Sequence, residues 1–385
     1  MTIELKRSYI NSVRTRYQNS TKKQKTKILD EFCATTKLSR KHAIRALNGK
    51  VNLKLIKPGR KAKYGGAEFL FHLVELWELM RRINSKKMKA AIPLWLPYYK
   101  DVPAYISSLL LEVSPATIDR LLKPYKNKKP KGVSSTRPSL IKNKIPLKLL
   151  DREVDYPGFI EADTVAHCGE SLSGEFISTL TMTDLMSSWT ENRALWTKTS
   201  EQVVKQMKRV ESRLPFFMVG LAVDNGSEFL NHDLHGYLTK RQAPLNFVRR
   251  RPYKKNDNAH VEQKNYTHVR QIMGYERFDD RKLVGMMNEI YQAYFNPLQN
   301  FFIPSQKLKS KAREGAKIKK KFEDPQTAYQ RLMDSTYLSR LQKKKLKEQY
   351  KQKNPIFLST QLKIKLKELH EYVAKVKEPV LKVAQ

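Results

Sequence analysis

Residues 219–228 read Val219-Gly220-Leu221-Ala222-Val223-Asp224-Asn225-Gly226-Ser227-Glu228, an apolar run that ends abruptly in a carboxylate and a tight turn. The run from Phe216 to Val223 carries no charge and lies between a proline and Asn-Gly. This pattern predicts a buried strand rather than a helix. Such a strand would deliver Asp224 to the edge of a sheet, where a carboxylate can hold a metal ion.

Two further carboxylates have a similar context. Asp163 lies in the apolar segment 159–165, which predicts a strand in which an unpaired carboxylate would be costly. Glu262 lies in the first turns of a predicted helix that begins at Asp257 or Asn258, where the helix dipole favours its ionised form. Asp224 follows Asp163 by 61 positions, and 37 residues lie between Asp224 and Glu262.

Taken singly, these acids have ordinary structural explanations, because Asp-Asn-Gly is a common turn and glutamate is common where helices begin. Together, in the order strand, strand end and helix, they favour a metal site. Carboxylate oxygens are the ligands that Mg²⁺ prefers, and we expect Mn²⁺ to substitute. Two such ions could hold the attacking and leaving oxygens of a phosphodiester, which is the chemistry of phosphoryl transfer.

On these residues the chain resembles the DDE transposases of bacterial insertion sequences, whose catalytic core is like that of retroviral integrases. The resemblance is carried by residues 161–164, 224–229, 251–253 and 258–265, and it covers about residues 155 to 275. It implies an RNase H-like fold, catalytic and metal-binding roles for Asp163, Asp224 and Glu262, and a DNA contact by Lys264. It also implies assembly as a homodimer or higher oligomer on paired DNA ends. The last gap between the acids is slightly longer than is usual in that family.

The charge of the chain points to a polyanionic partner. Its 385 residues include 75 Lys plus Arg against 37 Asp plus Glu, a formal net charge of +38. No apolar stretch approaches the ~20 residues that span a bilayer, and no signal peptide is evident, so we expect a cytoplasmic protein at the bacterial nucleoid with no membrane partner. Cys33 and Cys168 lack the spacing of a disulfide framework or a structural zinc site.

The N-terminal region, residues 1–55, is predicted to be an all-α helix-turn-helix unit. Helices over 21–32 and 38–47 are expected, with Ser39 as the cap of the second and Ile44 and Leu47 facing inward. Three cations would then face outward, where a recognition helix meets the major groove: Arg40, Lys41 and Arg45. The alternative is an ordinary helical hairpin with a solvated basic face.

A second helical region with helix-turn-helix character is predicted over residues 65–123. The helix over 68–82 has an apolar face typical of a core, and a later helix begins with Ser114 as cap and Pro115 in its first position. Thr117 and Arg120 are candidate DNA contacts there. Residues 124–150 contain many cations and prolines but no acid, which favours either an extended linker along phosphates or a solvated spacer.

Residues 151–298 are predicted to form an α/β catalytic core with a mixed five-stranded sheet. Strands are expected over 158–166, 175–184, 189–196, 216–223 and 245–250, and helices over 199–213, 228–240, 258–274 and 281–294. A basic loop precedes the helix of Glu262 and is predicted to hold the DNA end: Arg249, Arg250, Arg251, Lys254 and Lys255. The basic C-terminal region, residues 299–385, includes the basic run Lys317–Lys321 and is predicted to be mostly helical and partly flexible.

The function expected from this organisation is that of a DNA transposase. The protein would bind the terminal repeats of its element, and water and then the freed 3′-hydroxyl would attack phosphodiesters of element and target DNA in line. The result would be DNA cleavage and strand transfer, that is, transposition by DNA integration and recombination. Two alternatives stay open: an inactive helix-turn-helix regulator that only binds DNA, and an RNase H-like nuclease without joining activity.

Overall fold

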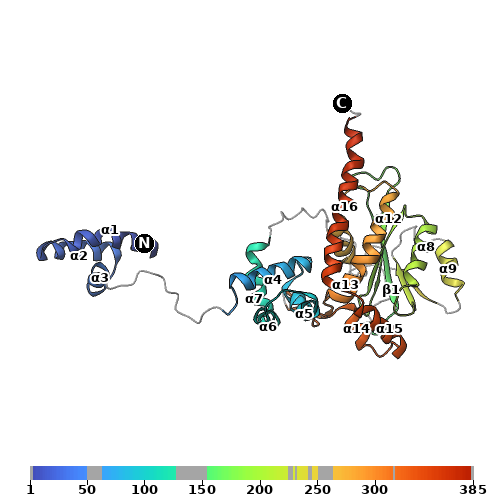
Figure 1. Cartoon of the computed structure of the whole chain (residues 1–385), viewed down its shortest axis with the longest axis horizontal. Coiled ribbons are helices and arrows are strands. Elements are labelled where there is room, and N and C mark those ends of the chain that lie inside the picture. The colour runs from blue at the N-terminus through green and yellow to red at the C-terminus, as the bar shows by residue number, and fades with distance from the viewer. Residues whose placement is uncertain are drawn as a thin grey trace. The chain divides into compact units, whose positions relative to one another are not determined.

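A computed structural model describes residues 3–49, 63–126, 154–223, 229, 232–241, 245–249, 263–314 and 317–382. Asp224, Glu262, Arg250, Arg251, Lys254, Lys255 and residues 127–150 of the predicted linker lie outside these ranges. The chain divides into two compact units, Met1–Lys63 and Tyr64–Gln385, each of which is described by itself (Figure 1). In the described ranges no helix has both the length and the apolar composition to cross a membrane.

The first unit packs three helices, α1 (Ile3–Gln18), α2 (Lys22–Thr36) and α3 (Arg40–Leu47), around one small apolar core. The two predicted helices are confirmed, and the three residues 37–39 join them. Ser39 occupies the cap position, but its side chain accepts no capping hydrogen bond. The inward position of Ile44 was predicted wrongly, because its side chain is 36% exposed. The buried stripe of α3 follows the helical spacing of Ala43, Ala46 and Leu47, and Ile44 lies beside that stripe.

The second unit begins with a group of helices whose buried faces agree with the sequence pattern. They are α4 (Ala67–Leu79), α5 (Ser85–Trp95), η1 (Leu96–Tyr98), α6 (Ala104–Glu112), α7 (Pro115–Leu122) and η2 (Lys123–Tyr125). The apolar face of α4 is buried as predicted. Ser114 caps α7 as predicted, and its hydroxyl oxygen accepts a hydrogen bond from the backbone N–H of Thr117 at 3.2 Å. The indole of Trp95 donates to the carbonyl of Phe302 at 3.0 Å, which ties this group to the rest of the unit.

The mixed five-stranded sheet predicted for the core is confirmed. Its strands are β1 (Phe159–Ala166), β2 (Ile177–Asp184), β3 (Thr190–Trp196), β4 (Gly220–Val223) and β5 (Asn246–Arg249), in the order β3-β2-β1-β4-β5. The first three strands pair antiparallel, and β4 and β5 continue the sheet in parallel with β1. Three antiparallel strands come first along the chain, and helices then alternate with the two parallel strands, as predicted from the sequence. A Cβ atom on Gly220 would lie 2.4 Å from the ring of Phe159, so glycine allows β4 to pair so closely with β1.

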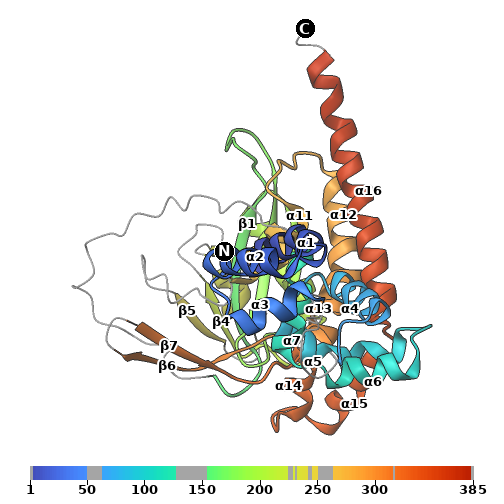
Figure 2. The same ribbon diagram turned by 90° about the vertical axis from the view of Figure 1, so that its left-hand side faces the viewer.

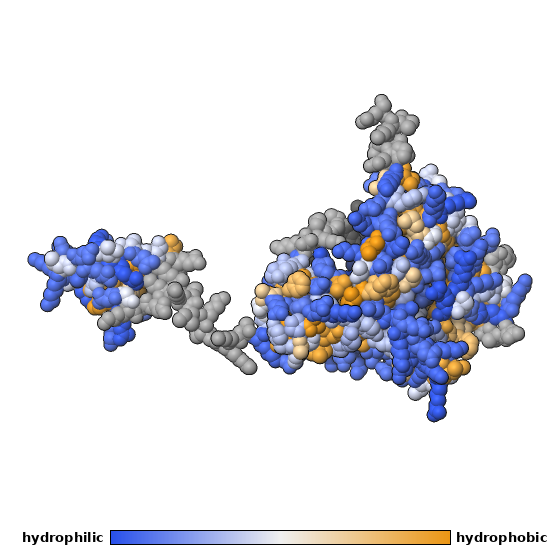
Figure 3. Space-filling model, viewed as in Figure 1, coloured by the Kyte–Doolittle hydropathy of each residue, from blue (hydrophilic) through white to orange (hydrophobic). Residues whose placement is uncertain are grey.

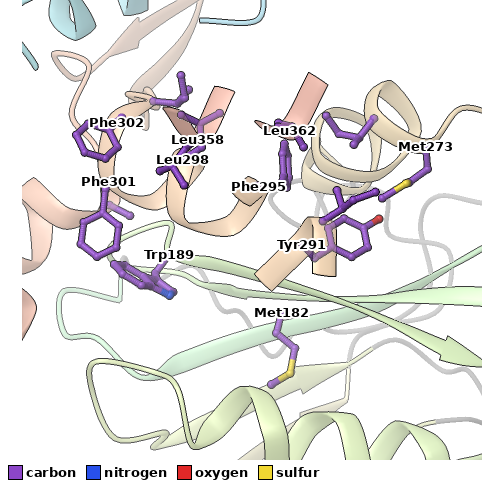
Figure 4. Packing of buried hydrophobic residues seen from close by; sticks show 14 of the residues in the cluster. Met182, Trp189, Met273, Tyr291, Phe295, Leu298, Phe301, Phe302, Leu358 and Leu362 are labelled. Carbon is purple, nitrogen blue, oxygen red and sulfur yellow. The ribbon is translucent and has the colours of Figure 1, made fainter. Parts of the chain in front are cut away.

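Helices cover both faces of this sheet (Figures 1 and 4). They are α8 (Ser200–Glu211), α9 (His232–Thr239), the π-helical η4 (Asn265–Arg270) with α11 (Gln271–Met273), and α12 (Lys282–Glu289), π-helical η5 (Ile290–Phe295) and α13 (Asn296–Phe302). Figure 4 shows Trp189, which directly precedes β3, beside Phe301 of α13, with their rings 5.3 Å apart and nearly perpendicular. This aromatic packing anchors the helices on the sheet.

The C-terminal region is helical for the most part, as predicted, and it packs on the core. It comprises an antiparallel hairpin of β6 (Leu308–Glu314) and β7 (Lys317–Phe322), then α14 (Ala328–Asp334), α15 (Arg340–Lys351) and α16 (Pro355–Lys382). Leu358 and Leu362 of α16 lie alongside Leu298 and Phe295 (Figure 4). The run Lys317–Lys321 is an exception to the mostly helical prediction, because it lies in β7. Cross-strand pairing with β6 overrides the helix propensity of lysine in this segment.

Candidate active site

Asp163 lies near the middle of β1, the central strand of the sheet, and its carboxylate is half-buried. One oxygen, Oδ1, accepts a hydrogen bond from the backbone N–H of Thr164 at 2.8 Å. The other, Oδ2, accepts one from the amide Nδ2 of Asn265 at 2.7 Å. Asn265 comes from the helical segment that starts at Gln263, 102 positions away in the chain. The carboxylate is therefore held in one orientation by donors from two elements.

The described ends of two other segments meet β1 at the same place. Val223, the last residue of β4, pairs in parallel register with Ala162, the neighbour of Asp163. Asp224 follows Val223 directly in the sequence, and Glu262 directly precedes Gln263. Both acids lie outside the described residues, and within those residues no group of three His, Cys, Asp or Glu side chains is placed to hold a metal ion.

Lys264, the predicted DNA contact, lines a cavity of about 1250 Å³ that Asp163 does not line. Its Nζ lies 3.5 Å from Nε2 of His268, one turn further along the segment. The wide π-helical turn over Asn265–Arg270 shares this segment, and turns of this kind occur often at functional sites. The segment therefore presents Asn265 to the carboxylate and Lys264 to the cavity.

The cavity is strongly cationic. Burial first, and then the charges of Lys87 and Arg331, lower the pKa of Lys264 to about 7. His268 is 4% exposed, and its Nδ1 has no hydrogen-bond partner among the described residues. Burial together with Lys264 lowers its pKa well below 6.5. Among the described residues, seven Lys and Arg line the space: Arg81, Arg82, Lys87, Lys264, Arg270, Lys307 and Lys363. Three acids of the described part of the chain also line it: Glu75, Glu78 and Asp184. Cations packed this closely repel one another, and an anion in the cavity would relieve that repulsion.

Two of these arginines hold an uncommon backbone conformation. Arg81 and Arg82 follow the end of α4 with φ of 60° and 55°, in the left-handed region that costs a side-chain-bearing residue about 1 kcal/mol or more each. Backbone bonds to α4 hold this turn, since the N–H of Arg82 donates to the carbonyl of Trp77 at 2.8 Å. Burial lowers the pKa of Arg81 to about 10. The turn keeps two cations at the wall of the cavity despite the cost.

The other predicted DNA contacts are distributed over both units. Arg40, Lys41 and Arg45 are all exposed on α3, and Arg40 forms an ion pair with Asp30 of α2. On α7, Arg120 is exposed and donates to the hydroxyl of Thr117 at 3.2 Å. The backbone of Arg249 ends β5.

Sequence patterns missed three residues of this region, namely Asn265, Lys87 and Arg81. A signal for Asn265 was present, because residues three apart on a helix share a face and Asn265 follows Glu262 by three. No sequence signal pointed to the two cations, because they come from a different group of helices.

Three comparisons with solved structures show distant likeness. The catalytic core domain of BIV integrase is 16% identical, with 31% of this chain and 70% of that chain covered at a TM-score of 0.24. The HTLV-2 integrase catalytic core domain in complex with magnesium is 15% identical, with 32% and 73% covered at a TM-score of 0.25. A simian T-cell lymphotropic virus intasome in complex with PP2A regulatory subunit B56 gamma is 12% identical, with 48% and 59% covered at a TM-score of 0.28. At TM-scores this low these likenesses do not decide the function of the chain.

No family model matches the chain. A protein of Sinorhizobium fredii, "Uncharacterized protein y4rM", is 34% identical over 328 residues, which cover 82% of this chain and 91% of y4rM. At this identity and coverage, the chain belongs to the same protein family as y4rM of Sinorhizobium fredii.

Proposed function

We propose that the protein is a DNA transposase that cleaves and joins DNA strands with Asp163, Asp224 and Glu262 as its catalytic acids. The observation that supports this most strongly is the hydrogen bond from Asn265 to Asp163. This hydrogen bond joins the segment that directly follows Glu262 to the central strand. The register of β1 and β4 places Val223, which directly precedes Asp224, beside Ala162, the neighbour of Asp163. Three acids far apart in the sequence would then share one site.

The donor set of this site fits Mg²⁺. Asp163 offers a half-buried carboxylate whose orientation is fixed, and Asp224 and Glu262 would add two more, which is the all-oxygen set that Mg²⁺ prefers. Two bound Mg²⁺ or Mn²⁺ ions would stabilise charge on the attacking and leaving oxygens of a phosphodiester.

The remaining roles fall to the chain's own polar groups. Asn265 orients the Asp163 carboxylate, and the cationic cavity with Lys264, Lys87 and Arg81 would hold phosphates of the DNA end close to the acids. The exposed cations of α3 would contact the terminal repeat of the element. We further propose that the protein acts in the bacterial cytoplasm, as a homodimer or larger oligomer on paired DNA ends.

A strand-transfer assay tests this proposal. The purified chain is incubated with a supercoiled donor that carries its own flanking genomic DNA, in Mg²⁺, Mn²⁺ or EDTA. We expect 3′-hydroxyl ends and joined products with either metal, and none in EDTA or with Glu262→Gln. The matched control is Glu170→Gln, which removes the charge of an exposed acid on another loop and should keep full activity.

Other outcomes identify the competing functions. Specific binding of the flanking DNA without any cleavage would contradict the proposal in favour of a DNA-binding regulator. Metal-dependent cleavage without joined products would favour a nuclease.

A further inference from the structure

The hairpin of β6 and β7 carries a dense, one-sided charge. Residues 307–321 contain eight Lys or Arg and a single acid, Glu314. Figure 2 shows the two strands as a long ribbon that extends from the sheet and helices of the second unit. Lys319, Lys320 and Lys321 are all exposed.

A contribution to the hydrophobic core does not explain why this ribbon is present. Two of its large apolar side chains, Leu308 and Phe322, are opposite one another at its base and are 41% and 50% exposed. A two-stranded hairpin by itself is marginally stable in water. Lys319, Lys320 and Lys321 are consecutive in the sequence, so their like charges lie close together. A polyanion beside the ribbon would reduce the repulsion among them.

Protection of a sheet edge does not account for the charge either. Lysine on edge strands prevents unwanted pairing between chains, and edges can also be protected by short strands, proline or bulges. A ribbon with eight cations and one acid has a much larger excess of one sign than such protection needs.

We propose that the β6–β7 hairpin is a DNA-binding ribbon that contacts the phosphates of duplex DNA along a groove. The major groove of B-DNA is about 12 Å wide and admits a two-stranded ribbon. Seven residues of β6 span roughly 20 Å or more, which is the length of about six base pairs. The contact needs no metal ion and no catalytic acid, and it rests on the proposed function only in that DNA is the substrate.

Duplex DNA fits the ribbon better than other nucleic acids do. Proteins that bind single strands stack bases on aromatic side chains, and Phe322 is the one aromatic residue within 307–322. The major groove of duplex RNA is too narrow and deep for such an element. The phosphate contacts would be independent of the DNA sequence, so the ribbon would increase the affinity for DNA without contributing to sequence specificity.

The test compares two triple variants of equal charge in a binding experiment with EDTA present. Lys319→Gln, Lys320→Gln and Lys321→Gln neutralise the ribbon, and Lys343→Gln, Lys344→Gln and Lys345→Gln remove the same charge from α15. Fluorescence anisotropy measures the affinity of each full-length protein for a random 20-base-pair duplex over a series of NaCl concentrations. Circular dichroism melting verifies that both variants fold.

We expect the ribbon variant to lower the slope of log affinity against log salt by about two to three, since each lost phosphate contact removes about 0.9. At moderate salt its affinity should fall by about tenfold or more, whereas the α15 variant should change the slope by less than about one. Equal losses in the two variants, or an equal loss for single-stranded DNA of the same length, would overturn the assignment. The binding experiment needs no DNA cleavage, so a failed strand-transfer assay would not contradict the assignment of the ribbon. Intact strand transfer together with equal salt slopes for the two variants would overturn the assignment of the ribbon but not the proposed function.

Discussion

Asn265 connects the two sides of the candidate site through a single hydrogen bond to Asp163. Replacing it with alanine removes the donor that orients the carboxylate. We expect Asn265→Ala to lower the strand-transfer rate by about 10- to 100-fold, the usual cost of losing a residue that supports a metal ligand. The Mg²⁺ concentration for half-maximal rate should rise, while affinity for DNA in EDTA should stay unchanged.

Gln263→Ala is the matched control for this variant. Gln263 begins the same segment and lines the cavity, but its side chain is exposed, so its loss should leave the metal requirement near that of the wild type. If Asn265→Ala kept the wild-type metal requirement and lost only thermal stability, the residue would be structural and not a positioning residue.

His167 directly follows β1, and its burial makes the stability of the fold depend on pH. It is fully buried against Phe278, and burial first, and then the charge of Arg270, lower its pKa from 6.5 to about 3. Between these values the unfolded chain binds the proton and the folded chain does not, so the free energy of unfolding falls as pH decreases from about 6.5 toward 3. The loss attributable to this group is a few kcal/mol, at about 1.4 kcal/mol per pKa unit.

Urea unfolding of the wild type and of His167→Gln at several pH values measures this effect. The variant should be less stable at neutral pH but should have a smaller decrease between pH 6.5 and 4. Buried Asp184, whose pKa burial raises to about 6, acts with the opposite sign and is present in both proteins. Identical pH profiles for the two proteins would show that His167 does not titrate in this way.

Sequence patterns identified Asp163 as a candidate because a carboxylate inside an apolar strand is unusual. The structure places Asp163 on the predicted strand. The patterns did not identify Asn265 as the partner of that carboxylate. Helical spacing puts Asn265 on the same face as Glu262, but the contact with Asp163 depends on how this segment packs on β1, 102 positions away.

At the scale of elements, β3 is an edge strand of the large sheet, and asparagines from the covering helices satisfy its backbone. Asn300 accepts from the N–H of Thr190 and donates to its carbonyl, both at 2.9 Å. Asn296 and Asn288 accept in the same way from the N–H groups of Asn192 and Ala194. Unpaired backbone groups on an edge promote pairing with other chains, and these contacts prevent it.

Asn300→Ala should therefore destabilise the protein by about 1–3 kcal/mol, because it leaves buried backbone groups of Thr190 without a partner. Chemical unfolding monitored by tryptophan fluorescence measures the change. Gln299→Ala, at the neighbouring half-buried position, should cost less than about 0.5 kcal/mol. Equal effects of the two substitutions would contradict the role of the asparagine contacts.

Most strands and helices of the core could be predicted because apolar periodicity marks which faces are buried. The structure departs from the predictions at two places where the decisive interaction was not local. Ile44 is apolar and was placed inward, although the core of the first unit uses the neighbouring stripe of α3. Lys317–Lys321 has helix-forming residues, but pairing with β6 makes it a strand.

At the scale of the whole molecule, the excess of cations is spread over both units, and the face of each unit seen in Figure 3 is mostly hydrophilic. Net charge alone predicted a polyanionic partner. It could not show that the cations divide among α3, the cavity wall and the β6–β7 ribbon, because these groups come from separate parts of the fold.

The division into two units predicts that each has its own stability. Each unit has a separate apolar core, so deleting residues 1–63 should shift the melting temperature of the remainder by less than about 3 °C, which corresponds to roughly 1 kcal/mol. The deletion should weaken binding to the element's terminal sequence much more than binding to random duplex. Calorimetry and anisotropy measure these two effects, and loss of the main unfolding transition would contradict the independence of the second unit.

The most direct measurement of the central claim is iron-mediated cleavage of the polypeptide. Fe²⁺ replaces Mg²⁺ in carboxylate sites, and with ascorbate and peroxide it generates radicals that cut the chain within a few ångströms of the ion. If Asp163, Asp224 and Glu262 share one metal site, mass spectrometry will find cuts close to all three residues. Excess Mg²⁺ should suppress these cuts, and Asp163→Asn should remove all of them together. Cuts confined to one segment, or unchanged in Asp163→Asn, would contradict a shared site.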